Sequence, residues 1–203
     1  MSNTNSILFA YLPAYAALHS LLASRQFKSL VWRIYGPGTD NWYMKFFGIF
    51  AVITLAPLAL LFLSSPGKRL YTIKPPWRWL MVAGQLVAGL ATMLAFTDAP
   101  HRFSISQQLG KAGKQEPLDP RGIYRYVQDP FLLGGFMQIW LTPFMTSRQL
   151  VLSAMTSVYL YLGSLHWERR LRYQFGREYE AYQKEVPRVI PKVLKSRLSG
   201  GSK

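Results

Sequence analysis

The chain has 203 residues, half of them apolar, with a formal net charge of +15 and no cysteine. The lack of cysteine excludes disulfides, thiolate nucleophiles and thiolate metal sites. The basic residues flank long apolar runs instead of forming one patch with interleaved aromatic residues, which argues against a nucleic-acid partner and favours anionic lipid headgroups as counterions.

Three apolar runs in the first half of the chain are each about as long as a membrane is thick. They cover residues 6–24, 46–65 and 79–97, and none contains an acidic or strongly basic side chain. A helix of about 20 such residues spans the roughly 30 Å hydrocarbon layer. The sequence therefore predicts three transmembrane helices here.

Two further apolar runs, 130–146 and 149–165, are shorter and meet at the turn "TSRQ". A helical hairpin satisfies its backbone polar groups internally, as lipid requires. We therefore predict an all-α polytopic membrane protein of about five transmembrane helices, built as one integral-membrane domain over 1–203. The last residues, about 194–203, are predicted to be a flexible tail.

The segment after the fifth run predicts an amphipathic helix over about 167–186. Its apolar stripe recurs at steps of three and four and consists of Leu171, Phe175, Tyr179, Tyr182 and Val186. Such a helix either lies on the headgroups or closes over the cytoplasmic mouth of the bundle, beside the long loop 98–129.

The distribution of basic residues predicts the orientation. With the N-terminus outside, 19 lysines and arginines fall on the cytoplasmic side and 5 on the outer side. The positive-inside rule favours this arrangement, with a cytoplasmic C-terminus.

The second half of the chain also carries an ordered set of motifs: "GIYRYVQDPFLLGG", then the hairpin with "LTPFMT", then "ERRLRYQFGREYEAYQKEVPRVIP". This order resembles the integral-membrane methyltransferases related to isoprenylcysteine carboxyl methyltransferase and phospholipid N-methyltransferase. The N-terminal "LHSLLAS" and the length are most similar to the bacterial branch with methanethiol S-methyltransferase and NnrU-like proteins. The resemblance implies a bacterial inner membrane and S-adenosylmethionine as the cofactor, held on the cytoplasmic side.

The cofactor motif of that family, Arg-His-Pro-x-Tyr-x-Gly, is only partly present. Gln128 stands where the family has arginine, Asp129 where it has histidine and Leu132 where it has tyrosine, whereas Pro130 and Gly134 match. A later pair of glutamates is reduced to one, because Trp167 precedes Glu168. Residues that shape the backbone are kept, and most that would grip a cationic cofactor are replaced.

The positions that the resemblance assigns to the cofactor are Tyr124, Asp129, Gly134, Glu168, Tyr179 and Tyr182. The tyrosines and Glu168 also have a structural alternative: the tyrosines as interface anchors or packing residues, and Glu168 as the partner of Arg172 at i+4. No catalytic residue is identified, and three scattered histidines without cysteine predict no metal site.

Two functions follow as hypotheses. The favoured one is a non-catalytic structural or accessory subunit, with the lipid bilayer and other subunits of a membrane complex as partners, because four cofactor-motif side chains are replaced. The alternative is an active S-adenosylmethionine-dependent methyltransferase for a small thiol or lipidic substrate, gripping the cofactor with Asp129 and Glu168. A weaker third idea makes His19 an axial ligand of a haem or pigment; a hydrogen bond to a neighbouring helix is favoured for that imidazole.

Overall fold

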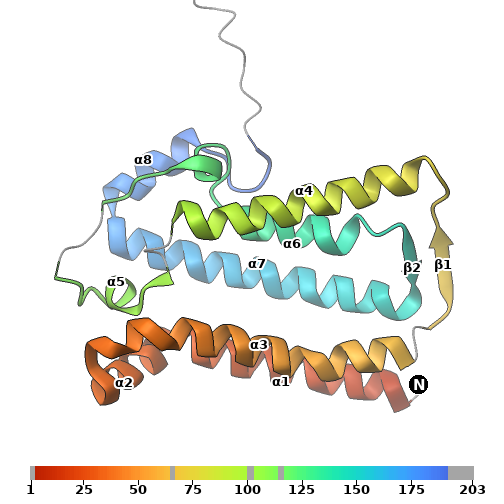
Figure 1. The fold of residues 1–203 in the computed structure, drawn as a ribbon, viewed down its shortest axis with the longest axis horizontal. Helices are drawn as coiled ribbons and strands as arrows, with labels where there is room; N and C mark the ends of the chain where they lie inside the picture. Colours follow the sequence, from red (N-terminus) through yellow and green to blue (C-terminus); the bar gives the residue numbers. More distant parts are fainter. Residues whose placement is uncertain (1–2, 65–66, 100–102, 114–116, 192–203) are drawn as a thin grey trace, which may run out of the picture. The chain divides into compact units, whose positions relative to one another are not determined.

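The computed structural model describes residues 3–64, 67–99, 103–113 and 117–191, and the tail predicted over 194–203 lies outside them. Helices dominate these residues, as predicted, and Figure 1 shows their order. The elements are α1 (Asn3–Ala23), α2 (Arg25–Tyr35), η1 (Gly36–Gly38), α3 (Thr39–Ser64), β1 (Arg69–Thr72), α4 (Trp77–Asp98), α5 (Ile105–Leu109), η3 (Gly122–Arg125), α6 (Pro130–Trp140), β2 (Phe144–Thr146), α7 (Ser147–Phe175) and α8 (Arg177–Glu185).

Internal contacts divide the chain into two compact units. The first holds residues 1–78, 100–116 and 143–159, and the second holds 79–99, 117–142 and 160–203. The long helix α7 contributes its N-terminal part to the first unit and its C-terminal part to the second. The single domain over 1–203 stays a prediction.

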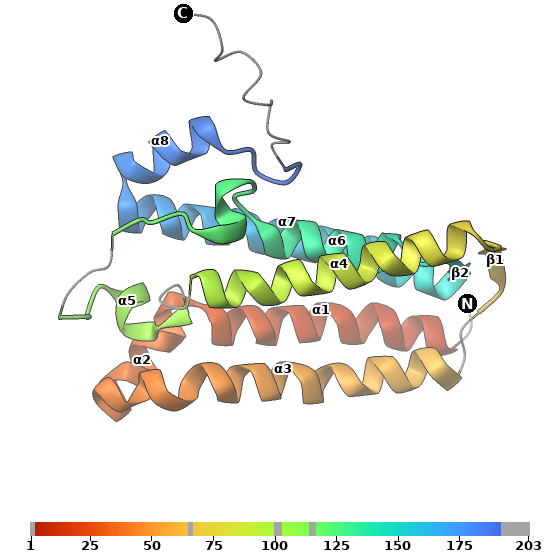
Figure 2. The ribbon, with the colours of Figure 1, turned by 45° about the horizontal axis from the view of Figure 1, so that its top comes forward.

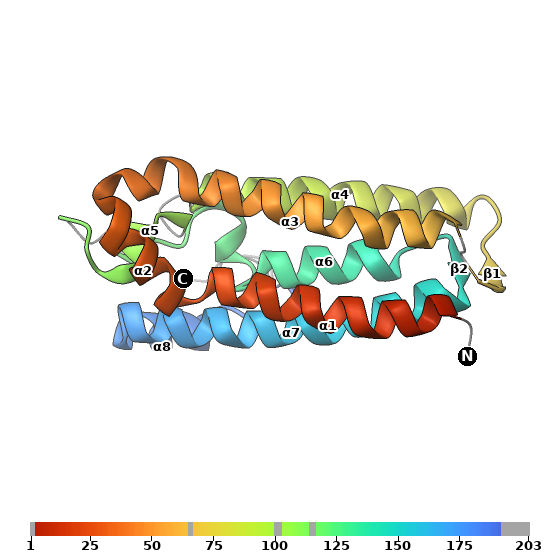
Figure 3. The same ribbon diagram turned by 90° about the horizontal axis from the view of Figure 1, so that it is seen from below.

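In the first unit, α1 packs against α3, and the short helix α2 connects the end of α1 to the start of α3 (Figure 3). Helix α2 begins at Ser24, whose hydroxyl accepts a hydrogen bond from the Phe27 amide at 3.2 Å, an N-cap that satisfies a free donor of the first turn. Tyr43 is 1% exposed, and its hydroxyl donates to the Leu22 carbonyl at 2.7 Å. This bond ties α3 to the end of α1.

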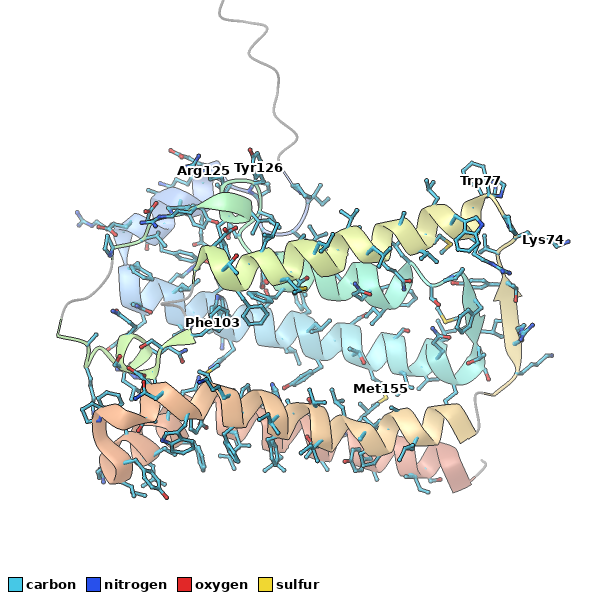
Figure 4. The ribbon with its side chains drawn as sticks, in the orientation of Figure 1. Lys74, Trp77, Phe103, Arg125, Tyr126 and Met155 are labelled. Atoms are coloured by element: carbon cyan, nitrogen blue, oxygen red, sulfur yellow. The ribbon has the colours of Figure 1, made fainter. Side chains whose placement is uncertain are left out.

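A two-stranded antiparallel ribbon also belongs to the first unit. Strand β1 pairs with β2, with Thr72 opposite Phe144 and Arg69 opposite Thr146, and the register shifts between Arg69 and Tyr71. The backbone amide of Ser147 donates to the Lys68 carbonyl at 2.8 Å and extends the ribbon. Lys74 and Trp77 follow directly on β1 in Figure 4.

Among the residues that the structure describes, two helical stretches are long and apolar enough to cross a membrane. They are Arg25–Leu60, in which α2, η1 and most of α3 follow one another, and α4. Only 11% of each apolar window is buried inside the protein, unlike the core helix of a soluble protein, so these stretches point to a membrane location. The count of about five spans stays a prediction.

The hairpin in the second half differs from the prediction in its element boundaries. The helix predicted over 130–146 ends at Trp140, and residues 144–146 form strand β2 instead. Pro143 explains this end, because proline disfavours a helical residue before it and has no amide to donate. Helix α6 has 11 residues and is therefore about 16 Å long, well short of the roughly 30 Å hydrocarbon layer.

The predicted amphipathic helix over 167–186 is divided into two helices. Helix α7 runs without a break to Phe175, and α8 begins at Arg177. Between them Gly176 adopts a φ of +51°, a conformation that favours glycine. As Figure 2 shows, α8 folds back over the C-terminal part of α7, beside η3.

Candidate functional site

The motif residues from Gln128 to Gly134 lie in the second unit, where α6 begins. Asp129 is the N-cap of α6, and its Oδ1 accepts a hydrogen bond from the Leu132 amide at 2.9 Å. Pro130 occupies the first turn, where the missing amide costs nothing. The half-buried Asp129 therefore has a structural task at this position, and it uses one of its two carboxylate oxygens.

The chain that follows α8, residues 186–191, lies against this helix start. The amides of Gln128 and Asp129 donate to the carbonyls of Pro187 and Arg188, both at 3.0 Å. The Gln128 side chain is 7% exposed, and its amide nitrogen donates to the Val186 carbonyl and, at 3.2 Å, to the Gln183 carbonyl. Gln128 thus joins the start of α6 to the end of α8.

Glu168 joins three segments of the second unit. Its Oε1 accepts hydrogen bonds from Arg172 at 2.8 Å and from the Gln183 side-chain amide at 2.9 Å. Its Oε2 lies 3.3 Å from a guanidinium nitrogen of Arg188. The i+4 pair with Arg172 that the sequence predicted is therefore present, and it belongs to a larger network.

Arg188 is held from more than one side. Besides Glu168, it donates to the Ser164 hydroxyl at 2.8 Å, and its guanidinium lies 5.3 Å from the ring centre of Tyr161. Arg172 in turn donates a hydrogen bond to the side-chain carbonyl oxygen of Gln183 at 3.1 Å. Two arginines therefore share the single carboxylate of Glu168, and we call Gln128, Glu168, Arg172, Gln183 and Arg188 the clamp.

The tyrosines assigned to the cofactor by resemblance are packed in the protein interior. Tyr124, Tyr179 and Tyr182 are 1%, 2% and 7% exposed. The hydroxyl of Tyr182 donates to the Tyr124 carbonyl at 2.6 Å, and that of Tyr124 donates to the Ala95 carbonyl at 3.1 Å. Both hydroxyls bind backbone, which anchors α8 on η3 and η3 on α4. Tyr179 and Tyr182 share a core cluster with Leu171.

Gly134 allows α6 to approach α4 closely. A Cβ at this position would lie 2.0 Å from the Thr92 hydroxyl oxygen and 3.3 Å from the Ala88 carbonyl oxygen. A second contact between the two helices is reciprocal, because the side-chain amides of Gln85 and Gln138 each donate to the backbone carbonyl of the other residue, at 2.9 and 2.6 Å. The packing role that the sequence predicted for the glycine is confirmed.

Trp167 and Leu132 stand at two positions where the resemblance led us to expect polar residues. Leu132 is 2% exposed, and Trp167 packs against the core cluster around Leu171. The guanidinium of Arg170 stacks 3.6 Å above the Trp167 ring, a close cation–π contact. By contrast, Arg125 and Tyr126 project from η3 toward solvent in Figure 4, and both are exposed.

His19 lies in the first unit, apart from these residues. Its ring packs against Phe47, Tyr15 and Tyr159, with ring centres 4.6, 5.5 and 6.1 Å away. Its Nδ1 is buried, and within the described part of the chain it has no hydrogen-bond partner, so the predicted bond to a neighbouring helix is absent there. No group of three or more metal-ligating side chains occurs among the described residues either.

Comparison with known proteins adds an independent observation. A methanethiol S-methyltransferase of Pseudomonas sp. (strain GM41(2012)) is 28% identical over 195 residues, which cover 88% of this chain and 70% of that relative. Methanethiol S-methyltransferase 2 of Bradyrhizobium diazoefficiens is 25% identical, with 93% of this chain and 74% of the relative covered. The Mycobacterium tuberculosis enzyme of the same name is 25% identical, with 89% and 75% covered.

These relatives support a methyltransferase-like family for the chain. No family model and no solved structure matches the sequence. Methyltransferases of this kind imply S-adenosylmethionine, which presents a cationic sulfonium and an ammonium group and therefore calls for anionic acceptors.

The residues present do not fit such a ligand well. Both oxygens of Glu168 are engaged, and the two guanidinium groups beside it outweigh its single negative charge, so the clamp offers no unpaired anion to a cation. Gln128 uses its amide to bind backbone carbonyls, and the indole of Trp167, next to Glu168 in the chain, packs against the core cluster around Leu171. Sequence reasoning missed Gln183 and Arg188 as members of this cluster: both lie in the C-terminal motif, but nothing in that pattern marks them as partners of Glu168.

Proposed function

We propose that this chain is a methyltransferase-like membrane protein in which the clamp serves to hold α6, α7 and α8 together and does not bind S-adenosylmethionine. The protein then works as a structural or accessory subunit of a larger membrane assembly. The observation that carries the proposal is the pairing of Glu168 with both Arg172 and Arg188. With two guanidinium groups and one carboxylate, the clamp has an excess of positive charge and does not attract a cationic cofactor.

The proposed placement is in a bacterial inner membrane, with the N-terminus outside and the C-terminus in the cytoplasm. The asymmetry of basic residues supports this orientation. Cysteine residues introduced singly near the N-terminus and in the exposed η3 segment, for example at Arg125, test it through their accessibility to a membrane-impermeant thiol reagent, since the natural chain has no cysteine.

The decisive experiment is calorimetric titration of the purified full chain with S-adenosylmethionine up to millimolar concentration. We expect no saturable heat and no thermal shift. The methanethiol S-methyltransferase of Pseudomonas sp. (strain GM41(2012)), prepared in the same detergent, is the positive control. Saturable binding near one equivalent by the natural chain would overturn the proposal.

The accessory role has its own test. Purification from its native membrane in a mild detergent is expected to retain partner proteins in constant ratio. Recovery of this chain alone, as a stable monomer under conditions that keep other membrane complexes intact, would contradict that part of the proposal while leaving the cofactor result unaffected.

An active methyltransferase is the second candidate, and one observation favours it. Among the described residues, Oδ1 of Asp129 caps α6, whereas Oδ2 has no hydrogen bond and remains available to an ammonium or hydroxyl group. The names of the relatives make methanethiol the first substrate to test, with membrane lipids second. Methyl-labelled cofactor incubated with the full chain and either substrate distinguishes the candidates by the appearance of labelled product.

A further inference from the structure

The start of α3 carries an open groove on its exposed side, in the first unit. Its lining residues are Met44, Lys45, Gly48, Ile49, Val52 and Ile53. They recur at steps of one and three, so they follow one face of the helix for about two turns. Gly48 makes the hollow in this face, because a Cβ placed there would have no other atom within 4 Å.

One end of the groove is cationic. Lys45 is exposed, and within the described residues its ammonium group takes part in no ion pair or hydrogen bond. The other lining residues are Gly48, which has no side chain, and four residues with apolar side chains: Met44, Ile49, Val52 and Ile53. The groove therefore combines one positive charge, at the end nearer the N-terminus of α3, with an apolar channel along the helix.

A row of three exposed aromatic rings beside Lys45 indicates how deep this lysine lies in the membrane. The rings of Tyr35 and Trp42 lie 5.5 Å apart, and those of Trp42 and Phe46 lie 6.0 Å apart. These three side chains are 62%, 38% and 45% exposed. Tyrosine and tryptophan concentrate at the membrane–water interface. Lys45 follows Trp42 within one helical turn, so it lies at the level of the lipid headgroups.

The length of the groove fits one leaflet of a bilayer. From Lys45 to Ile53 the helix rises about 12 Å, and half of the hydrocarbon layer is about 15 Å thick. The groove therefore starts at the headgroups and descends into the acyl region without leaving the leaflet.

The shape of the groove favours an acyl chain over a second helix. Close packing of two transmembrane helices needs small residues in successive turns. Here only Gly48 is small, and the flanking residues of the turns before and after it are Met44 and Val52. The hollow left by the missing side chain of Gly48 has about the width of a single polymethylene chain.

We infer that this face of α3 binds one anionic phospholipid, with its phosphate at Lys45 and one acyl chain along Gly48, Ile49, Val52 and Ile53. The positive end selects the negatively charged headgroup, and the apolar channel holds the chain. This inference does not depend on whether the clamp binds a cofactor.

The test uses the full chain purified in detergent and incubated with equal amounts of phosphatidylglycerol and phosphatidylcholine of identical acyl chains. Native mass spectrometry counts the bound lipids of each type. Lys45→Gln removes the charge, and Lys74→Gln is the matched control, because Lys74 is an exposed lysine next to β1 (Figure 4). Gly48→Leu fills the groove, and Gly163→Leu is its control, because Gly163 is also a helical glycine with open space around it.

We expect the natural chain to retain phosphatidylglycerol in preference to phosphatidylcholine. Lys45→Gln should lower that preference about fivefold and Lys74→Gln should not, since one lysine at an anionic surface accounts for a change of this size. Gly48→Leu should remove the retained lipid of both types, and Gly163→Leu should leave it.

Three results would overturn the inference. Equal losses in the two lysine variants would indicate diffuse surface charge, and retention of the lipid by the Gly48→Leu protein would place it elsewhere. A change of oligomeric state in Gly48→Leu, with no change in lipid count, would make the face a contact between copies of the chain. Far-ultraviolet circular dichroism of each variant confirms that the helices are intact.

Discussion

Replacement of Glu168 by glutamine should destabilise the second unit, because this carboxylate joins α7, α8 and the residues after α8. Glu168→Gln keeps the size and one carbonyl oxygen but removes the charge. The exposed i+4 pair with Arg172 contributes about 0.3 to 0.5 kcal/mol. The hydrogen bond from Gln183 to a charged acceptor contributes about 1.5 to 3 kcal/mol, of which a neutral acceptor recovers part.

The Arg188 guanidinium, whose side chain is 27% exposed, also loses its anion in this variant. Together these losses amount to about 2 kcal/mol. In a chain of this size that corresponds to a fall in melting temperature of about 4 to 8 °C. Tryptophan fluorescence during heating in detergent measures it. The control is Glu180→Gln, which changes an exposed glutamate of α8 whose side chain has no ion pair or hydrogen bond with any described residue.

A double-mutant cycle separates the clamp from a general charge effect. Glu168→Gln and Arg188→Gln each remove one side of the same pair, so the double variant should be less unstable than the sum of the singles by about 1 kcal/mol. Strict additivity, or an unchanged melting temperature in Glu168→Gln, would refute the assignment of Glu168 to the clamp.

Further substitutions test the packing around the candidate site, all by thermal or denaturant unfolding in detergent. Gly134→Ala should cost about 1 to 3 kcal/mol because its Cβ overlaps a hydroxyl of α4, whereas Gly163→Ala in open space should stabilise its helix by up to about 1 kcal/mol. Equal effects of the two would contradict the close approach of α6 and α4. Tyr182→Phe should cost about 1 kcal/mol by removing the hydroxyl bond to the Tyr124 carbonyl, and an unchanged protein would show that this bond contributes nothing. Asp129→Ala should cost about 1 kcal/mol through loss of the α6 cap, and Asp129→Asn should restore most of it; equal losses would argue for a role of the charge.

The helices of the apolar runs in the first half could be predicted because a run of about 20 apolar residues is itself enough to indicate a membrane-spanning helix. The run at 79–97 lies within α4, which covers Trp77–Asp98. Of the run at 46–65, residues 46–64 lie within α3, which covers Thr39–Ser64, and residue 65 lies outside the described residues. Helix α2 was not predicted, since residues 25–45 carry several bases and were interpreted as a connection. Its N-cap Ser24 and its Gly36 C-cap were visible signals of its ends.

The second half shows what local patterns leave open. Nothing in the sequence near residues 144–146 indicates that they pair with residues 69–72. The spacing of apolar residues can suggest a strand, but it does not identify the distant segment with which a short strand pairs. The stripe through Leu171, Tyr179, Tyr182 and Val186 was correctly grouped, since these residues share one core cluster. The prediction of one continuous helix through these residues was wrong, because the chain bends at Gly176, between α7 and α8.

The candidate site was predictable as far as the motif reached. The motif placed Gln128, Asp129 and Glu168 in one site, and the spacing gave the pair between Glu168 and Arg172. The second arginine was not predictable, because Arg188 reaches Glu168 only through the path that the chain takes after α8. That path decides the charge of the cluster, and so it also decides what kind of ligand the cluster attracts.

The ribbon of β1 and β2 has a consequence for the biogenesis of this protein. Its two strands are separated by about 75 residues, and synthesis at about 5 to 20 residues per second delays the second strand by roughly 4 to 15 seconds. During this interval the nascent β1 presents unpaired amide and carbonyl groups along an edge that invites other strands. A chaperone or the insertion machinery that shields residues 69–72 until residues 144–146 emerge would protect the nascent chain from aggregation.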